Sequence, residues 1–366
     1  MKKRLSCVFL LFSVIVLSGC WDQRELKNIR MVHMAGIDLM ENGLVKLTVS
    51  IPTVKSSLES SAKVVTPKVS AEGHTVLEAS NFLQQVVSQH MDLREIRILL
   101  VNEKYAKKDL YEGLDFFYRE AHFPISVYIA VTNSSAHNIV QLAVEDRSLI
   151  SEYLYDLLKS GEEDGMIPRE SPYLISSTLN KPGKDIVLPY VISSSIKGRA
   201  RIDGIALFHN KKMTGKLKDE VARTFVMLSP QKSHGMLTEQ IGPKDSYVTF
   251  SFESKHENMK IDTQNGITVN LYATLLCQLV DNPTGEKLNE SKTVEMGRQL
   301  ERLLTERAKE MVKQLQTANC DGYGIGYRIK ATNPHLWETL AWETTYPKIK
   351  IEPHITVNVR NRGLLN

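Results

Sequence analysis

Two long strand-like runs followed by a long amphipathic helix constrain the C-terminal half of the chain. The runs Ser246 to Ile261 and Ile267 to Val280 flank Asn265-Gly266, a pair that tolerates positive φ and favours an antiparallel hairpin. Between Asn289 and Ala318, apolar residues recur at the i, i+3, i+4 and i+7 spacing of one helical face. These residues are Met296, Leu300, Leu303, Leu304, Ala308, Met311, Val312 and Leu315. Because such a face must be covered, we expect the helix to pack on an antiparallel sheet.

The first part of the chain alternates strands and helices. Asn42-Gly43 is a second hairpin signal, and Thr75 with Glu78 has the spacing of a helix capping box. Ser56 to Pro67 is rich in serine and lacks periodicity, which predicts a loop, with a partner-binding segment as the alternative. The expected elements are strands at Met31–Asp38 and Leu44–Ile51, a helix after Thr75, a strand at Ile96–Val101, a helix with Ala106, Leu110, Leu114 and Phe117 on one face, and a strand at Ile125–Thr132.

The chain as a whole is expected to be an α+β protein of about three domains, with mixed and antiparallel sheets packed against helices. Residues 135–160 have a helical pattern, and a polar break follows over 161–172. Beyond it we expect a strand at Ile202–Phe208, a helix at Lys218–Leu228 and a last strand at Ile349–Val359. The predicted divisions are an N-terminal α/β domain over 31–133, a mainly helical region over 134–200 that is a candidate second domain, and a C-terminal α+β domain over 201–366.

The N-terminus has the pattern of a lipoprotein signal. Lys2, Lys3 and Arg4 precede an apolar run from Leu5 to Leu17, and Leu17-Ser18-Gly19-Cys20 follows. The run is too short to span a bilayer comfortably, and small residues before Cys20 suit a cleavage site. We predict that residues 1–19 are removed, that Cys20 receives a diacylglyceryl group, and that residues 20–30 form a short tether. Two acyl chains would hold the protein stably on the outer face of a membrane. An uncleaved anchor and a plain secretory signal are the alternatives.

Net charge and cysteine content bear on two questions, whether the chain binds nucleic acid and whether it contains a disulfide. Removal of the signal lowers the formal charge from +4 to about +1, which leaves no global field for binding nucleic acid. Cys277 lies in an apolar run and Cys320 follows the long helical pattern. A disulfide between them is possible outside the cell, but two buried free thiols are the simpler interpretation.

The sequence contains no recognised catalytic motif. No two histidines have the spacing of a zinc hydrolase helix, and neither a Gly-x-Ser-x-Gly elbow nor a phosphate loop occurs. Gly322, Gly324 and Gly326 have the wrong spacing for a dinucleotide fingerprint, so turn glycines are expected there. Lys197, Arg199 and Arg201 alternate as they would along one strand face, either solvated or facing an anionic membrane. Trp337 and Trp342 are expected to pack in a core, and Arg119 to lie on the surface. We predict no metal, no cofactor and no catalytic residue.

Several segments together resemble the Ger(x)C lipoproteins, the C subunits of spore germinant receptors. Gly19-Cys20-Trp21-Asp22, followed by Glu25-Leu26, is similar to their mature start. Later segments agree in order: Met34-Ala35-Gly36-Ile37-Asp38, Leu114 to Glu120, Asp203 to Phe208 with Gly215-Lys216-Leu217, Asp321 to Gly326, Trp337, Trp342 and the final strand running to Gly363. The turn Asp321-Gly322-Tyr323 departs from the residues expected in the family.

The resemblance implies a three-domain α+β protein on the outer surface of the spore inner membrane. It implies a non-enzymatic subunit that works with a multi-pass A subunit and a transporter-like B subunit to trigger germination. Only Cys20 carries over with a role, as the lipidated residue, while Trp21, Asp22 and Glu25 are motif positions without an assigned role. The alternatives are a solute-binding lipoprotein of an importer, which usually has two parallel-sheet lobes around a cleft, and a surface hydrolase with clustered carboxylates or histidines.

Overall fold

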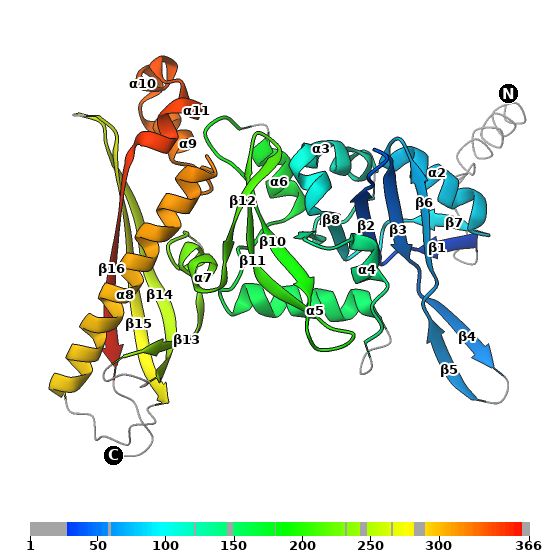
Figure 1. Ribbon diagram of the computed structural model, residues 1–366, viewed down its shortest axis with the longest axis horizontal. Coiled ribbons are helices and arrows are strands. Elements are labelled where there is room, and N and C mark those ends of the chain that lie inside the picture. Colours follow the sequence, from blue (N-terminus) through cyan, green and yellow to red (C-terminus); the bar gives the residue numbers. More distant parts are fainter. Residues whose placement is uncertain are drawn as a thin grey trace, which may run out of the picture.

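An eight-stranded mixed sheet runs through the first two thirds of the protein (Figure 1). The computed structural model describes residues 28–360 apart from 58–59, 121, 145–148, 180, 231–232, 242–246, 265 and 282–289. The strand order is β12-β11-β10-β9-β8-β2-β3-β6. The strands are β2 (Met34–Leu39), β3 (Val45–Ser50), β6 (Lys68–Gly73), β8 (Ile98–Asn102), β9 (Tyr128–Thr132), β10 (Val187–Ser193), β11 (Ala200–His209) and β12 (Lys212–Lys218).

The centre of this sheet is parallel and both of its edges are antiparallel. Strands β2, β8, β9 and β10 run in the same direction, and hairpins add β3 with β6 on one side and β11 with β12 on the other. Strands β10 and β11 are hydrogen-bonded neighbours, so the sheet continues across residues 200 and 201, where the sequence predicts a domain boundary. The division into domains at that position stays a prediction.

Helices cover both faces of the sheet. On one face lie α2 (Val76–Val86) and α3 (Glu103–Arg119), and on the other lie α4 (Ala136–Val140) and α5 (Ile150–Glu163). The expected capping residue Thr75 accepts a hydrogen bond from the Glu78 amide at 3.1 Å. The four residues predicted to form the buried face of α3 are all buried, namely Ala106, Leu110, Leu114 and Phe117. The helical period therefore predicted the covered face correctly.

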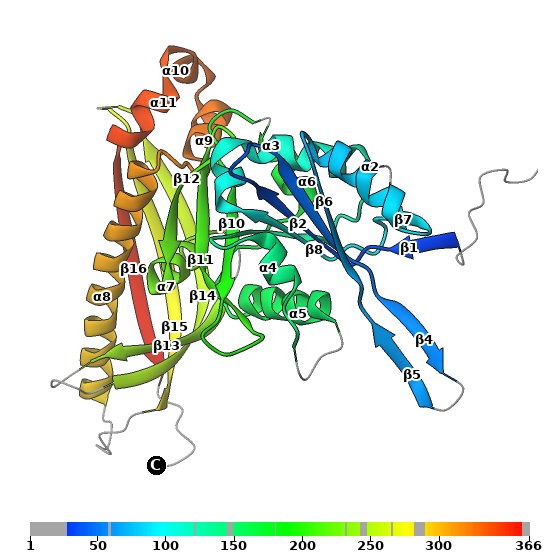
Figure 2. The same cartoon turned by 45° about the vertical axis from the view of Figure 1, so that its right-hand side comes forward.

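Two local predictions were wrong. The predicted loop Ser56–Pro67 contains the end of β4 (Thr53–Ser57) and all of β5 (Ser60–Val65), which pair as an antiparallel ribbon that projects from the sheet (Figure 2). Backbone pairing needs no apolar alternation, which is why the periodicity did not reveal it. The helical pattern predicted over 135–160 corresponds to α4 and α5, but it is wrong for residues 141–144, which follow α4 and are not helical.

The C-terminal part consists of a four-stranded sheet backed by the longest helix. The order is β13-β14-β15-β16, with β13 (His234–Gln240), β14 (Tyr247–Asp262), β15 (Thr268–Asp281) and β16 (Lys350–Arg360). Strands β14 and β15 form the predicted antiparallel hairpin, but β16 pairs with β15 in parallel. Helix α8 (Glu290–Thr317) crosses between β15 and β16 and packs on β16, which confirms the predicted helix on a sheet (Figure 2).

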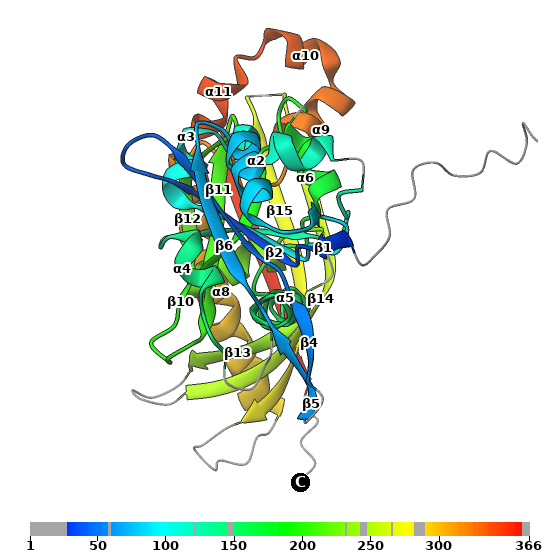
Figure 3. The same cartoon turned by 90° about the vertical axis from the view of Figure 1, so that its right-hand side faces the viewer.

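The C-terminal part and the eight-stranded sheet share one apolar core. Helix α7 (Asp219–Met227) lies between them and packs on β11, β12 and α8. Buried residues from Met34 in β2 to Leu304 in α8 belong to the same cluster. Past α8, the chain forms a cap at one end of the molecule (Figure 3) from α9 (Ile325–Thr332), α10 (Pro334–Thr339), α11 (Trp342–Thr345) and the 3-10 helix η2 (Tyr346–Lys348).

Two short elements fix the start of the described chain. Strand β1 (Ile29–Met31) pairs in parallel with β7 (His90–Asp92), which follows α2. Ile29 is buried, so the chain is held against the folded body nine residues after Cys20. Nine extended residues span at most about 32 Å, so an anchor at Cys20 would keep this end close to a membrane.

Candidate functional site

The residues predicted to carry the anchor lie outside the described part of the chain. This applies to the signal over 1–19, to Cys20, and to the motif positions Trp21, Asp22 and Glu25. Their roles therefore stay predictions. Within the described ranges, no helix is long and apolar enough to cross a membrane.

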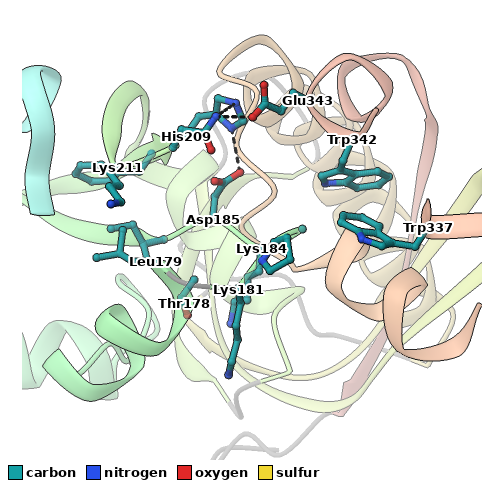
Figure 4. Close-up of a pocket in the computed structure, with 15 residues that line it drawn as sticks. Thr178, Leu179, Lys181, Lys184, Asp185, His209, Lys211, Trp337, Trp342 and Glu343 are labelled. Carbon is teal, nitrogen blue, oxygen red and sulfur yellow. Dashed lines mark hydrogen bonds and ion pairs between the residues drawn. The ribbon is translucent and has the colours of Figure 1, made fainter. Parts of the chain in front are cut away.

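A pocket of about 440 Å³ lies where the cap meets the end of β11 (Figure 4). Helix α6 (Pro172–Leu179) and the loop after it form one wall, and α10 and α11 form the opposite wall. Figure 4 shows the ring of Trp342 and the carboxylate of Glu343 on the cap side, with His209 and Asp185 between the walls. The side chains that define the pocket are those of Leu179, Lys184, Asp185, His209, Lys211, Trp337, Trp342 and Glu343.

Trp337 and Trp342 pack against the main apolar core and also line this pocket. Both are only half-buried, their ring centroids lie 5.7 Å apart, and Trp342 lies 5.7 Å from Tyr346. The predicted packing on the core is confirmed, but each ring also presents a surface to the pocket. The close packing of Trp342 requires a glycine at position 326 in α9, because a Cβ on Gly326 would lie 2.5 Å from Cε2 of Trp342. The prediction of turn glycines holds for Gly322 and for Gly324, the left-handed N-cap of α9, but it is wrong for Gly326, which lies in the first turn of α9.

Asp321 lies just before α9 and holds the cap in place through its side chain. Its carboxylate accepts hydrogen bonds from the amides of Ile325 and Gly326, each at 2.8 Å, and from Nε1 of Trp342 at 3.2 Å. The side chain is fully buried, and this burial raises the pKa of Asp321 to about 7, with a further contribution from the charge of Asp185. Asp321 therefore fixes the start of α9 and the orientation of Trp342 at the same time.

A hydrogen-bonded network joins three segments around His209. Nδ1 of His209 lies 3.4 Å from Oδ2 of Asp185, which accepts a hydrogen bond from the Asp321 amide at 2.9 Å. Nε2 of His209 lies 3.3 Å from Nδ2 of Asn319, which donates to the Glu343 carbonyl. The hydrogen bond to Asp185 raises the pKa of His209. These groups hold β11, the end of α8 and α11 together, which is a structural use of a histidine–carboxylate pair.

Neither the spacing nor the composition of the sequence indicated this network. Asp185, His209 and Glu343 are far apart along the chain, and no motif links them. The segment Asp321 to Gly326 was the one signal, because glycines in a turn after a helix indicate close packing. Among the described residues, no group of three or more His, Cys, Asp or Glu could hold a metal ion.

The charged residues singled out from the sequence lie apart from the pocket. Lys197 and Arg199 lie in the turn before β11, where Gly198 has a φ of +73°, so the predicted alternation along one strand is wrong. Arg199 lies 5.3 Å from the ring of Tyr153, and Arg201 forms an ion pair with Asp203 at 2.6 Å. Arg119 pairs with Asp115 on the exposed surface of α3, as expected.

Cys277 and Cys320 are both free and buried. The simpler of the two interpretations is therefore confirmed, and the possible disulfide does not form. Burial raises the pKa of the Cys277 thiol to about 12 and that of Cys320 in the same direction. Neither sulfur is a reactive thiolate at neutral pH.

Comparisons with known proteins give a consistent result over nearly the whole chain. Residues 22–193 match the family described as spore germination protein N-terminal domain, and residues 203–363 match spore germination B3/GerAC like, C-terminal. Spore germination protein GerQC of Bacillus cereus is 24% identical, with 98% of each chain covered. Spore germination protein KC of Bacillus subtilis strain 168 is 25% identical over 100% of this chain and 97% of its own. The crystal structure of the GerBC protein has a similar fold, with a TM-score of 0.58, 15% identity, and coverage of 89% of this chain and 97% of that one.

Proposed function

Since the chain belongs to the Ger(x)C family of spore germination proteins, we propose that it is the lipid-anchored C subunit of a nutrient germinant receptor. The observation that carries this proposal is the match of both family domains in order over residues 22–193 and 203–363. The first match begins at residue 22, two residues after the predicted lipidation site at Cys20, so the proposed signal precedes the family domains directly.

The proposed location is the outer face of the spore inner membrane. A diacylglyceryl group on Cys20 would supply two acyl chains, which is enough for stable anchoring. The short distance from Cys20 to β1 would hold the eight-stranded sheet near the headgroups. Confinement to the membrane raises the effective concentration of the chain toward integral partners, so modest contacts would be enough for assembly.

The proposed partners are a multi-pass A subunit and a transporter-like B subunit, and the proposed role is non-enzymatic. The His209 network supports the second point, because its polar groups are used to join segments of the chain. An importer's solute-binding protein is a poorer fit. Its two lobes usually resemble one another, whereas the sheets here have eight and four strands in different orders.

The anchor can be tested by labelling spores metabolically with an alkyne fatty acid. The wild-type chain should incorporate the label and stay with the membrane fraction, and Cys20→Ala should lose both properties. Cys7→Ala is the matched control, because Cys7 would leave with the signal. Label on Cys20→Ala, or an unlabelled wild-type chain in the soluble fraction, would contradict the anchor.

A further inference from the structure

A second cavity shares part of its lining with the first pocket, namely Thr178, Lys181 and Lys184 from α6 and the loop that follows it. Its volume is about 460 Å³, within the range of about 300–1,000 Å³ that small-molecule sites have. It is formed by α6, α9 and the β14–β15 hairpin. It therefore lies where the part that contains the eight-stranded sheet meets the C-terminal part. Such junctions are common places for ligand sites. We call this cavity the junction cleft.

Three cationic side chains line the junction cleft, Lys181, Lys184 and Arg328. Figure 4 shows Lys181 pointing away from the two tryptophans, and its ammonium lies 5.5 Å from the ring centroid of Tyr327. The stem of Lys184 lies close to Gly324, where an added Cβ would be 3.1 Å from Cδ of the lysine. In the described part of the chain, none of the three cations forms an ion pair within 4.0 Å.

The junction cleft also lacks compensating acids among its described lining residues. This distinguishes it from the pocket lined by Trp337 and Trp342, where Asp185 and Glu343 accompany the shared Lys181 and Lys184. The half-buried carboxyl of Glu170 interacts electrostatically with Lys184. Burial raises the pKa of Glu170 to about 7, so this group is only partly ionised at neutral pH. The cleft therefore carries a net positive charge.

The floor of the junction cleft is apolar. Leu228 and Leu271 are only 5% and 2% exposed, and Met259 and Tyr323 lie beside them. The Tyr323 hydroxyl is already used, since it donates to the Phe225 carbonyl at 3.0 Å. An occupant would place an apolar group on this floor and an anionic group among the three cations. A zwitterion would fit less well, because its ammonium would find no carboxylate in the described lining.

We propose that the junction cleft binds a small soluble carboxylate that carries an apolar group. The cleft would recognise the carboxylate through Arg328 and Lys184, with Lys181 at the rim, and the apolar group through Leu228, Met259 and Leu271. This inference does not depend on the lipid anchor or on the partner subunits. Carboxylate binding is measured on this chain without partner subunits, so the result would stand even if the receptor assignment were wrong.

Calorimetric titration of the full-length chain in nanodiscs of zwitterionic lipid tests the proposal. Phenylacetate should bind saturably, whereas phenylacetamide, phenethylammonium and acetate should bind at least about tenfold more weakly. Each lacks the negative charge or the apolar group. Arg328→Gln and Lys184→Gln should each weaken phenylacetate binding about tenfold, the size expected for one charge-assisted hydrogen bond.

Lys330→Gln is the matched control, because Lys330 is an exposed cation on the same helix that does not line the cleft. The Lys330→Gln variant should bind phenylacetate with the same affinity as the wild type. Equal binding of phenylacetate and phenylacetamide, or an equal effect of all three substitutions, would overturn the proposal. Loss of phenylacetate binding in nanodiscs that contain anionic lipid would assign the cleft to a lipid headgroup, and would also overturn it.

Discussion

At the scale of single residues, Asp321 carries the most distinctive chemistry in the described chain. It is a fully buried carboxyl that accepts three hydrogen bonds, yet burial and Asp185 raise its pKa above the ordinary value of 3.8 to about 7. The folded chain therefore binds this proton more tightly than the unfolded chain does. Stability that depends on the proton is complete below about pH 4 and is lost as the pH rises through about 7.

We expect Asp321→Asn to remove this pH dependence. The free energy of unfolding of the wild type, relative to the variant, should fall between pH 4 and pH 8 by up to about 4 kcal/mol. Urea unfolding followed by tryptophan fluorescence measures it, because Trp342 donates directly to Asp321. A wild-type minus variant difference that stays constant over this range would contradict the raised pKa.

Gly204 is a residue whose backbone conformation excludes other side chains. It lies at a β-bulge in β11 with a φ of +134°, and an added Cβ would come within 2.0 Å of the Leu217 carbonyl oxygen in β12. We expect Gly204→Ala to destabilise the chain by more than about 3 kcal/mol in chemical unfolding. Gly43→Ala is the control, since Gly43 has a φ of +82° but no atom within 4 Å of its Cβ position. It should cost only about 1 kcal/mol. Equal losses of unfolding free energy in the two variants would show that the contact between Gly204 and Leu217 does not matter for stability.

At the scale of elements, the buried face of α8 determines how the C-terminal sheet is closed. Leu304 is fully buried and Leu303, its neighbour in the sequence, is half-buried. We expect Leu304→Ala to lower the free energy of unfolding by about 2–5 kcal/mol, because it removes apolar contacts and leaves a cavity. Leu303→Ala should cost less than half of that amount in the same assay. A larger loss at Leu303 would mean that α8 packs through a different face.

The same elements show which parts of the fold a sequence can predict. The hairpin β14–β15, the stripe of α8 and the cap at Thr75 depend on neighbours within a few residues, so local periodicity was sufficient. The parallel pairing of β16 with β15 and the order of the eight strands join segments far apart in the chain. No local pattern encodes that order. The ribbon β4–β5 was missed for a similar reason, because cross-strand backbone pairing leaves little trace in residue type.

The candidate site was less predictable than the fold. Trp337, Trp342 and the turn from Asp321 stand out in the sequence, but Asp185, which accepts from the Asp321 amide, lies in the loop before β10. Its other partner, His209, ends β11 of the eight-stranded sheet. The junction cleft combines α6, α9 and the β14–β15 hairpin, and its cations are ordinary surface residues in the sequence. Convergence of side chains from three elements is a property of the tertiary structure.

At the scale of the whole molecule, the shared core makes the chain a connected body whose N-terminal end would lie near the membrane. The account depends most on the partners of that body. The direct measurement is affinity capture of the tagged full-length chain from dormant spore membranes, with captured proteins identified by mass spectrometry. We predict recovery of a multi-pass A subunit and a transporter-like B subunit, and a reduced yield with Cys20→Ala. Recovery of importer permeases in their place, or of no integral membrane protein, would contradict the receptor assignment.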